Sequence, residues 1–366
     1  MEAKDLHVVV PFNNPMQWKS RLANARRTED GLLAAGVTLT TVELTYGNRP
    51  FTLPDREGVN RIRLVSNDVL WHKENLARIA FSQIEWQHGA IIDGDVLFHD
   101  KDWPIRTLHA LQIAPVVQIS TDLVFLGPSG QHLGTRQSYM RRYRTERTRV
   151  RSLDSVKYNI TIPIVPNGDG YPGGAWGYRH DAYEAMGGLL DICIIGAGDQ
   201  HMAWAMTESP DALIEQDTSP YGVAVQAWRR QCAATIKRDV GIVSGLAVHL
   251  WHGKRVDRKY PGRWKILGDN KFDPATDITR DSNGLIRLAG NKPHLRDDLR
   301  AYFAARNEDS TDLDAPDVLA PDMLRSRHHH HRHHHGHYDD NGCGPYDRPE
   351  PHHRERWWEW LEFWDW

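Results

Sequence analysis

Short apolar runs alternate with amphipathic segments through the first hundred residues, and this alternation limits the folds open to the chain. Residues 6–10 and 37–44 are rich in apolar and β-branched side chains, which is typical of buried strands. Residues 15–35 and 70–83 carry apolar side chains at helical spacing, and residues 89–97 predict a further strand. Strands that alternate with helices predict an α/β domain whose largely parallel central sheet is flanked by helices.

A parallel sheet also limits where a ligand can bind, because the carboxyl ends of parallel strands meet at one edge. Residues 11–14 follow the first expected strand, and Asp93 and Asp95 follow the apolar run at 90–92 within the last one. Two aspartates one residue apart are more often an ordinary turn than a metal site. His249 and His252 are candidate partner ligands, although a pair of structural histidines would give the same pattern. The residues alone leave both interpretations open.

The bulk composition excludes little. At 366 residues the chain can bury a substantial core, and its formal net charge of -3 does not indicate a nucleic-acid or membrane partner. We find no apolar leader and no run that could span a bilayer, so we expect a cytoplasmic protein. The three cysteines share no metal-type spacing and are expected to be reduced.

Residues 136–151 are crowded with arginine. A solvated surface loop is the favoured interpretation, because runs of arginine are common on surfaces. The alternative is a patch that binds phosphate or a polyanionic acceptor such as DNA. The arginines concerned are Arg136, Arg141, Arg142, Arg144, Arg147, Arg149 and Arg151.

The composition changes near residue 309. Residues 312–322 are acidic and contain proline, residues 328–337 are nearly all histidine, and residues 357–366 carry clustered tryptophans. We therefore expect a domain of residues 1–308, followed by a disordered, low-complexity tail over residues 309–366.

Several short blocks follow one another in an order that resembles the β-1,4-galactosyltransferases. More broadly, the order resembles the GT-A glycosyltransferases, including family 2 members from bacteria and phages. The resemblance covers roughly residues 6–257, and the ordered series is more specific than any one block. The blocks are VVPFNN at 9–14, WHKENLAR at 71–78, DGDVL at 93–97, GGAWGYRHDAYEAMGG at 173–188, GAGD at 196–199 and HLWH at 249–252.

The resemblance implies a GT-A fold, with a nucleotide-sugar half over about residues 1–135 and an acceptor half over about residues 155–308. It implies a metal ion on Asp95 and His252. His249 is a second candidate ligand, since it stands where the family has methionine. Aspartate with imidazole suits Mn²⁺ better than Mg²⁺.

The same resemblance implies roles around the acceptor. Asp199 is the expected catalytic base, but the family has consecutive acids here, so Asp199 could instead bind the acceptor. His201 is the alternative base, because imidazole titrates near neutral pH. Gly174 and Trp176 are expected beside the acceptor sugar, where an aromatic face packs well on sugar C–H groups.

The resemblance also implies roles for residues on the donor side. Pro11, Asn13 and Glu43 are expected to line the nucleotide pocket from strand ends. Lys73 matches a family arginine that contacts the diphosphate, and Asp93 is expected to face the ribose or a metal-bound water. These roles rest on the resemblance, while the position of the residues at strand ends is physically sensible.

The function that the resemblance implies is an inverting, metal-dependent glycosyltransferase. Its donor would be a nucleotide-sugar, expected to be a UDP-sugar, and its acceptor a hydroxyl on a glycan, a small molecule or modified phage-type DNA. One alternative is a sugar-phosphate nucleotidyltransferase, disfavoured because residues 11–14 are not a glycine-rich loop. The other is a non-catalytic protein that binds nucleotide-sugars or carbohydrate. The sequence leaves the oligomeric state open.

Overall fold

The computed structural model describes residues 1–146, 170–207, 218–260 and 262–313. The chain divides into a compact unit of residues 1–319 and a second unit of residues 320–366. The second unit, which holds the His/Trp-rich part of the predicted tail, lies outside the described residues, so the first unit is the one described here.

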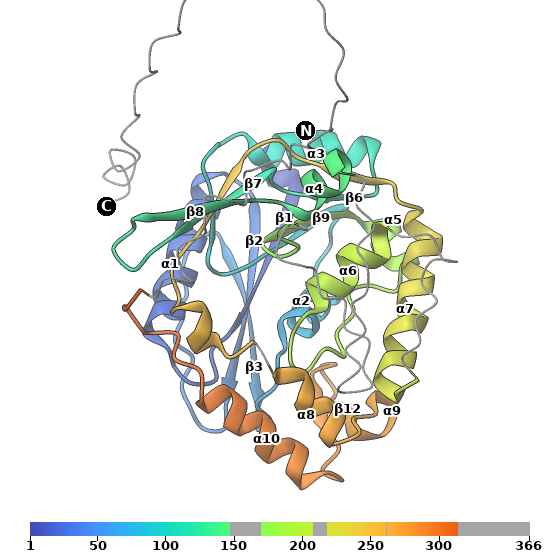
Figure 1. Cartoon of the computed structure of the whole chain (residues 1–366). Coiled ribbons are helices and arrows are strands. Elements are labelled where there is room, and N and C mark those ends of the chain that lie inside the picture. Colours follow the sequence, from blue (N-terminus) through green and yellow to red (C-terminus); the bar gives the residue numbers. More distant parts are fainter. Residues whose placement is uncertain (147–169, 208–217, 261, 314–366) are drawn as a thin grey trace, which may run out of the picture. The chain divides into compact units, whose positions relative to one another are not determined.

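A seven-stranded sheet forms the centre of this unit, in the order β10-β6-β9-β4-β1-β2-β3 (Figure 1). Every neighbouring pair is parallel except those of β9, which runs antiparallel to both β4 and β6. The predicted α/β fold with a largely parallel sheet is therefore confirmed. The strands are β1 (Leu6–Asn13), β2 (Thr38–Tyr46), β3 (Val59–Ser66), β4 (His88–Ile92), β6 (Val116–Gln118), β9 (Ala175–Arg179) and β10 (Val240–Ile242).

Helices cover both faces of this sheet, which explains why the inner strands β1 and β4 are mostly apolar and buried. Val8 and Val10 of β1 pack in a cluster with α1 (Lys19–Ala34) and α3 (Trp103–Ile113). Val9 points the other way, into a cluster with α2, α5 and α6. The remaining helices are α2 (Lys73–Gln83), α4 (Tyr139–Glu146), α5 (His180–Ala185), α6 (Gly198–Thr207), α7 (Pro220–Ile236), α8 (Arg263–Asp269), α9 (Pro274–Asp277) and α10 (Pro293–Ala304).

A second sheet has four strands, in the order β5-β11-β7-β8. Its strands are β5 (Val96–Phe98), β7 (Asp122–Leu126), β8 (His132–Gln137) and β11 (Leu246–His249). The single strand expected over residues 89–97 is therefore wrong: β4 ends at Ile92, and β5 starts at Val96 in the other sheet. Gly245, at a φ of +151°, lies in the short connection between β10 and β11.

The segment after α10 returns to the start of α1, beyond the expected end of the domain. The Asp309 carboxylate accepts hydrogen bonds from the backbone N–H groups of Lys19 and Ser20, at 2.9 and 2.8 Å. The Trp251 indole donates to the Ser310 carbonyl at 2.7 Å. The predicted boundary at residue 308 is therefore too early, because Asp309 satisfies amides at a helix start rather than opening a solvated tail.

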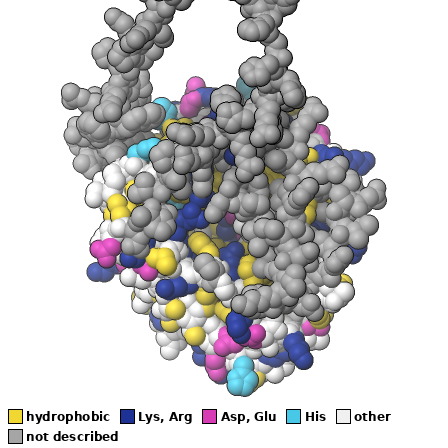
Figure 2. All heavy atoms as spheres, viewed as in Figure 1, with side chains coloured by type: hydrophobic (Ala, Val, Ile, Leu, Met, Phe, Trp, Pro, Cys, Tyr) yellow, Lys and Arg dark blue, Asp and Glu magenta, His cyan; other side chains and the backbone are white. Residues whose placement is uncertain are grey.

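The arginine-rich segment is partly helical, so the expected loop is wrong for α4, whereas residues 147–151 lie outside the described residues. Arg141 forms an ion pair with Asp122, and Arg144 donates to the Val240 carbonyl at 2.7 Å. The guanidinium of Arg136 lies 5.8 Å from the centre of the Phe125 ring. Where the face in Figure 2 is drawn in colour, basic, acidic and hydrophobic side chains are intermixed.

Among the helices of the described residues, we find none with both the length and the apolar character needed to cross a membrane.

Candidate active site

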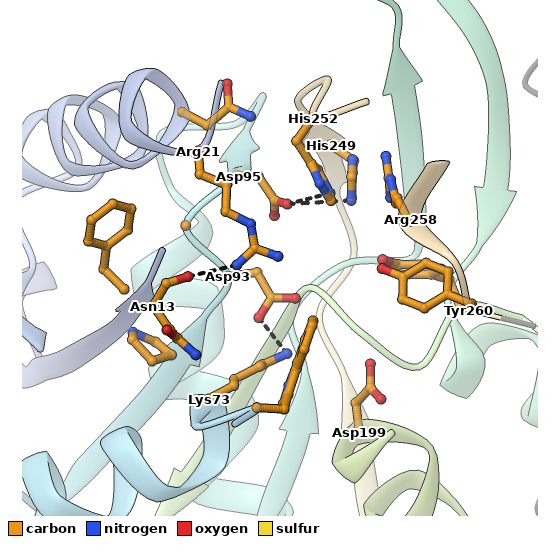
Figure 3. Close-up of a pocket in the computed structure, with 16 residues that line it drawn as sticks. Asn13, Arg21, Lys73, Asp93, Asp95, Asp199, His249, His252, Arg258 and Tyr260 are labelled. Atoms are coloured by element: carbon orange, nitrogen blue, oxygen red, sulfur yellow. Dashed lines mark hydrogen bonds and ion pairs between the residues drawn. The ribbon is translucent and has the colours of Figure 1, made fainter. Parts of the chain in front are cut away.

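One pocket opens at the carboxyl ends of β1 and β4 (Figure 3). The register pairs Val9 with Ile91, so Pro11 and Asp93, each two residues further on, reach the same edge of the sheet. The pocket brings together residues from five separate blocks of the sequence. Predicted site residues in its lining are Pro11, Asn13, Lys73, Asp93, Asp95, Asp199, His249 and His252.

Asp95 and the two histidines form a cluster that could hold a metal ion. The His252 Nε2 and His249 Nε2 atoms lie 3.0 and 3.7 Å from Asp95 Oδ2, and one ligand atom from each residue lies within 4.8 Å of the others. The second carboxylate oxygen, Oδ1, is buried without a hydrogen-bond partner. A buried carboxylate oxygen needs a partner, and a divalent cation at this place would supply one.

The local fold explains why these three side chains meet. Asp95 ends the turn that carries the chain from the central sheet to β5, and β5 pairs with β11 so that Val96 lies opposite His249. The Leu250 N–H donates to the Asp95 carbonyl at 2.8 Å, which fixes the segment leading to His252. The crossing between sheets therefore places Asp95 against both histidines.

Two of the three groups, His249 and Asp95, are in the protonation state that a cation needs. Burial lowers the pKa of His249 to about 3, so its imidazole is neutral at neutral pH. Burial would raise the pKa of Asp95, but the neighbouring imidazoles keep it below its ordinary value. For His252, burial and Arg258 would lower the pKa, whereas hydrogen bonds to Asp95 and Glu308 raise it above its ordinary value.

Glu308 is a fully buried carboxylate behind the cluster. Its Oε2 atom accepts from His252 Nδ1 at 2.9 Å and from Arg21 Nε at 2.5 Å. Its Oε1 atom accepts from Arg306 Nη2 at 2.6 Å. Sequence reasoning missed Glu308, because it lies outside every motif, at the edge of a segment whose composition indicates a tail.

Asp93 is held in place from two sides. Lys73, at the start of α2, forms an ion pair with it at 2.5 Å. Gly174, at a φ of +96°, donates its N–H to Asp93 Oδ2 at 3.1 Å and accepts from the Asp93 N–H at 2.9 Å. Burial alone would lower the pKa of Lys73, but Asp93 and Asp199 raise it, so the amine stays charged. Gly174 thus supports Asp93 instead of lining the pocket.

Asp199 reaches the pocket from the first turn of α6, opposite the metal cluster in Figure 3. A Cβ atom on Gly173 would lie 2.9 Å from Asp199 Oδ2, so the absence of a side chain there leaves room for the carboxylate. Three aromatic residues, Trp71, Tyr171 and Tyr260, also line the pocket.

The Asn13 side chain is largely engaged by the protein. Its amide donates to the Leu70 carbonyl at 3.0 Å and accepts from the Tyr46 hydroxyl at 2.5 Å. Its backbone carbonyl accepts from Arg21 Nη1 at 2.8 Å. Asn13 therefore shapes the rim of the pocket and has little remaining hydrogen-bonding capacity.

Besides Gly174, three more of the expected residues do not line this pocket. The Glu43 carboxylate accepts from the backbone and side chain of Thr52, at 2.5 and 2.8 Å, and faces a separate cavity. Trp176 is 2% exposed and donates its indole N–H to the Pro172 carbonyl at 2.7 Å. It belongs to a central strand whose two faces are covered, so its ring packs in the core.

His201, the third, is 1% exposed and lies 3.3 Å from the Tyr221 hydroxyl. Burial, helped by the cations of Arg229 and Arg263, holds the pKa of His201 well below its ordinary value. The expectation that it could act as the base is corrected, because its ring is sealed in the interior, away from the pocket.

Arg258 and Tyr260 are among the pocket-lining residues that were not predicted. Arg258 is the last residue of the short helix η3 (Arg255–Arg258). Its Nε atom donates a hydrogen bond to the Gly253 carbonyl at 3.1 Å. Burial alone would raise the pKa of Tyr260, but Arg258, Arg306 and His252 lower it to about 8. The only sequence signal was the basic composition of residues 254–259.

No protein-family model and no curated protein sequence matches the chain. Among solved structures, the chain is similar to the catalytic domain of Drosophila β1,4-galactosyltransferase 7 in complex with xylobiose. The identity is 12%, the match covers 79% of this chain and 98% of that one, and the TM-score is 0.35. It is also similar to S. aureus TarS 1–349, at 14% identity over 56% of each chain and a TM-score of 0.31. These likenesses concern the fold alone, so the chemistry is argued from the site.

Proposed function

We propose that this chain is a metal-dependent glycosyltransferase of the GT-A type, which moves a sugar from a nucleotide-sugar, expected to be a UDP-sugar, to an acceptor hydroxyl. One observation supports this most strongly. Asp95, His249 and His252 meet from distant parts of the sequence and share a pocket with Asp93 and Asp199. The motif order that resembles the galactosyltransferases anticipates this same set.

The donor atoms of the cluster fit a divalent cation. Asp95 offers a buried oxygen without a partner, and the two histidines direct Nε2 atoms toward the same carboxylate. This mixture of carboxylate and imidazole favours Mn²⁺ over Mg²⁺. When bound, the ion would supply Lewis-acid stabilisation of the negative charge that develops on the departing diphosphate.

Basic residues complete the donor side. Arg258 and Arg21 line the pocket on the same side as the metal cluster, and both guanidinium groups suit phosphate oxygens. Pro11 and Asn13 form the rim where the nucleoside would lie. The Lys73–Asp93 ion pair keeps the Asp93 carboxylate fixed for the ribose or a bound water, and Lys73 itself is a candidate for contact with the diphosphate.

Asp199 is the proposed general base. Its carboxylate would accept the proton of the acceptor hydroxyl while that oxygen forms the new bond to the anomeric carbon. The bond from that carbon to the diphosphate breaks in the same step, which gives inversion. Trp71, Tyr171 and Tyr260 line the same pocket as Asp199, where an aromatic side chain would pack against a sugar ring.

A glycan or a small molecule is the proposed acceptor. DNA remains the alternative that the arginine-rich segment raises, but Arg141 and Arg144 are engaged by Asp122 and the Val240 carbonyl. A nucleic-acid acceptor would make turnover fall steeply with salt, because phosphate contacts release counterions. Turnover that is constant between low and moderate salt would remove DNA from consideration.

The test is a thermal-shift screen of nucleotide-sugars, each with and without Mn²⁺. We expect one donor to raise the melting temperature in a metal-dependent way, and Asp95→Ala to abolish that shift. Asp122→Ala is the matched control, since both aspartate side chains are 21% exposed but Asp122 lies outside the pocket lining. Metal-independent binding that survives Asp95→Ala would indicate a binding protein, and no response to any donor would refute the proposal.

A further inference from the structure

The carboxylate behind the metal cluster has a role of its own. We propose that Glu308 is a positioning residue, which holds the His252 ring through its Nδ1 atom and so presents Nε2 to a metal ion beside Asp95. The inference rests on the metal site of the proposed function and adds to it a residue from outside every sequence motif.

The hydrogen bonds of His252 give the first step. Its ring is 5% exposed and lies between two carboxylates, with Nδ1 2.9 Å from Glu308 Oε2 and Nε2 3.0 Å from Asp95 Oδ2. A carboxylate can only accept hydrogen bonds, so when Nε2 binds a metal ion, the one proton of the neutral imidazole belongs on Nδ1, where Glu308 accepts it. The lone pair of Nε2 is then directed toward Asp95, where the metal ligands converge.

Glu308 is itself fixed before any ligand arrives. Arg21 reaches both of its oxygens, at 2.5 and 2.9 Å, and Arg306 donates two hydrogen bonds to Oε1, at 2.9 and 2.6 Å. A buried carboxylate with this many donors has few alternative rotamers. The His252 ring is therefore already ordered in the folded protein, so the entropy cost of ordering it does not weaken metal binding.

Arg21 connects this carboxylate to the donor side of the pocket. It donates to the Asn13 carbonyl at 2.8 Å, and its guanidinium lies 5.1 and 5.7 Å from the ring centres of Trp18 and Trp71. The same arginine thus links the end of β1 to Glu308. Glu308 is accordingly placed to couple the metal ligand to the rim of the nucleotide pocket.

The informative variant is Glu308→Gln. Its amide oxygen, at the Oε1 position, can still accept from Arg306 and from Arg21 Nη2. Its NH₂ then takes the Oε2 position, where it loses the bond from Arg21 Nε and faces His252 Nδ1, which must accept. The ring proton moves to Nε2 and blocks the ligand atom. We expect the Mn²⁺ concentration for a half-maximal thermal shift to rise by about 10–100-fold, as for other residues that orient a metal ligand. Glu308→Asp, which keeps the charge but shortens the reach, carries the same test should the glutamine variant not fold.

Two controls separate positioning from general damage. Asp191→Asn removes another buried carboxylate that pairs with an arginine, at 2.7 and 2.8 Å from Arg280, but lies outside the pocket lining. It should lower the melting temperature and leave the Mn²⁺ response unchanged. The Asp95→Ala variant measures the background Mn²⁺ response that comes from the histidines at 328–337, which can bind metal by themselves.

A double-mutant cycle tests whether Glu308 acts on metal binding through His252. If Glu308 acts through His252, Glu308→Gln will not weaken Mn²⁺ binding further in a His252→Asn background. An Mn²⁺ response of Glu308→Gln within twofold of the wild type, or equal losses in both backgrounds, would overturn the role of Glu308 alone. If Asp95→Ala responds like the wild type, the metal site and the role of Glu308 both fall.

Discussion

The two sides of the pocket differ in how far their side chains follow from their place in the sequence. On the donor side, Asp93, Asp95 and Lys73 stand at the ends of parallel strands or at the start of the next helix, and all line the pocket. On the proposed acceptor side, Trp176 lies in a block that resembles the family and His201 directly follows another, yet both are buried in the core. Position at a strand end or in the first turn of a helix directs a side chain to the pocket, as for Asp199, whereas a position further inside the element does not.

The largest effect should come from the donor side. Asp95→Ala removes a central ligand, and Lewis-acid stabilisation is worth several kcal/mol, so we expect glycosyl transfer to fall by about 10³-fold or more. Mn²⁺ should no longer shift the melting temperature of this variant in the presence of donor. Near-normal turnover of Asp95→Ala, measured beside Asp122→Ala, would contradict the metal role.

On the acceptor side, Asp199→Asn should lower kcat by roughly 10²–10⁴-fold, the usual contribution of a general base. Donor binding should remain, because the metal cluster and Lys73 are untouched. Product formation and donor-induced thermal shift, measured on the same samples, separate the two steps. A variant that loses donor binding and turnover together would move Asp199 to the donor side.

The burial of His201 can be tested through the pH dependence of folding stability. Its pKa in the folded protein lies well below the ordinary value of 6.5, so the unfolded chain takes up the proton first as pH falls. The contribution of His201 to the free energy of unfolding is fully present above about pH 6.5. Below that pH it decreases by about 1.4 kcal/mol for each pH unit. Urea unfolding of His201→Gln should show a shallower loss between pH 6.5 and 5.5, with donor binding at pH 7.5 unchanged. An unchanged slope would argue against burial of this ring.

The smallest effect should come from Asp309, which satisfies two amides at the start of α1. Asp309→Ala should lower the free energy of unfolding by about 1 kcal/mol, the usual cost of losing a helix cap. Asp312→Ala, three residues further on at an exposed position, is the matched control. Equal stability of the two variants would return the boundary of the domain to residue 308.

The sequence predicted the layers of the fold, and most of the donor-side residues that it singled out line the pocket, although Glu43 does not. This part was predictable because alternating strands and helices place strand ends at one edge. The sequence could not predict the division of residues 89–97 between two sheets, since only Asp93, Gly94 and Asp95 separate the apolar residues of β4 and β5. Nor could it identify Glu308, whose contacts with Arg21 and His252 span 287 and 56 residues of sequence. The arrangement of Trp176 and His201 depends on which face of an element is covered, and this is set by tertiary packing.

The return of the chain to α1 after α10 has a consequence for synthesis. Every motif of the pocket has been synthesised by residue 252, but the carboxylate that contacts His252 and the carboxylate that caps α1 are added only with residues 308 and 309. A chain that stops between these points would contain the full series of motifs and still lack the carboxylate behind the proposed metal site. Partial translation products that end before residue 308 should therefore be inactive.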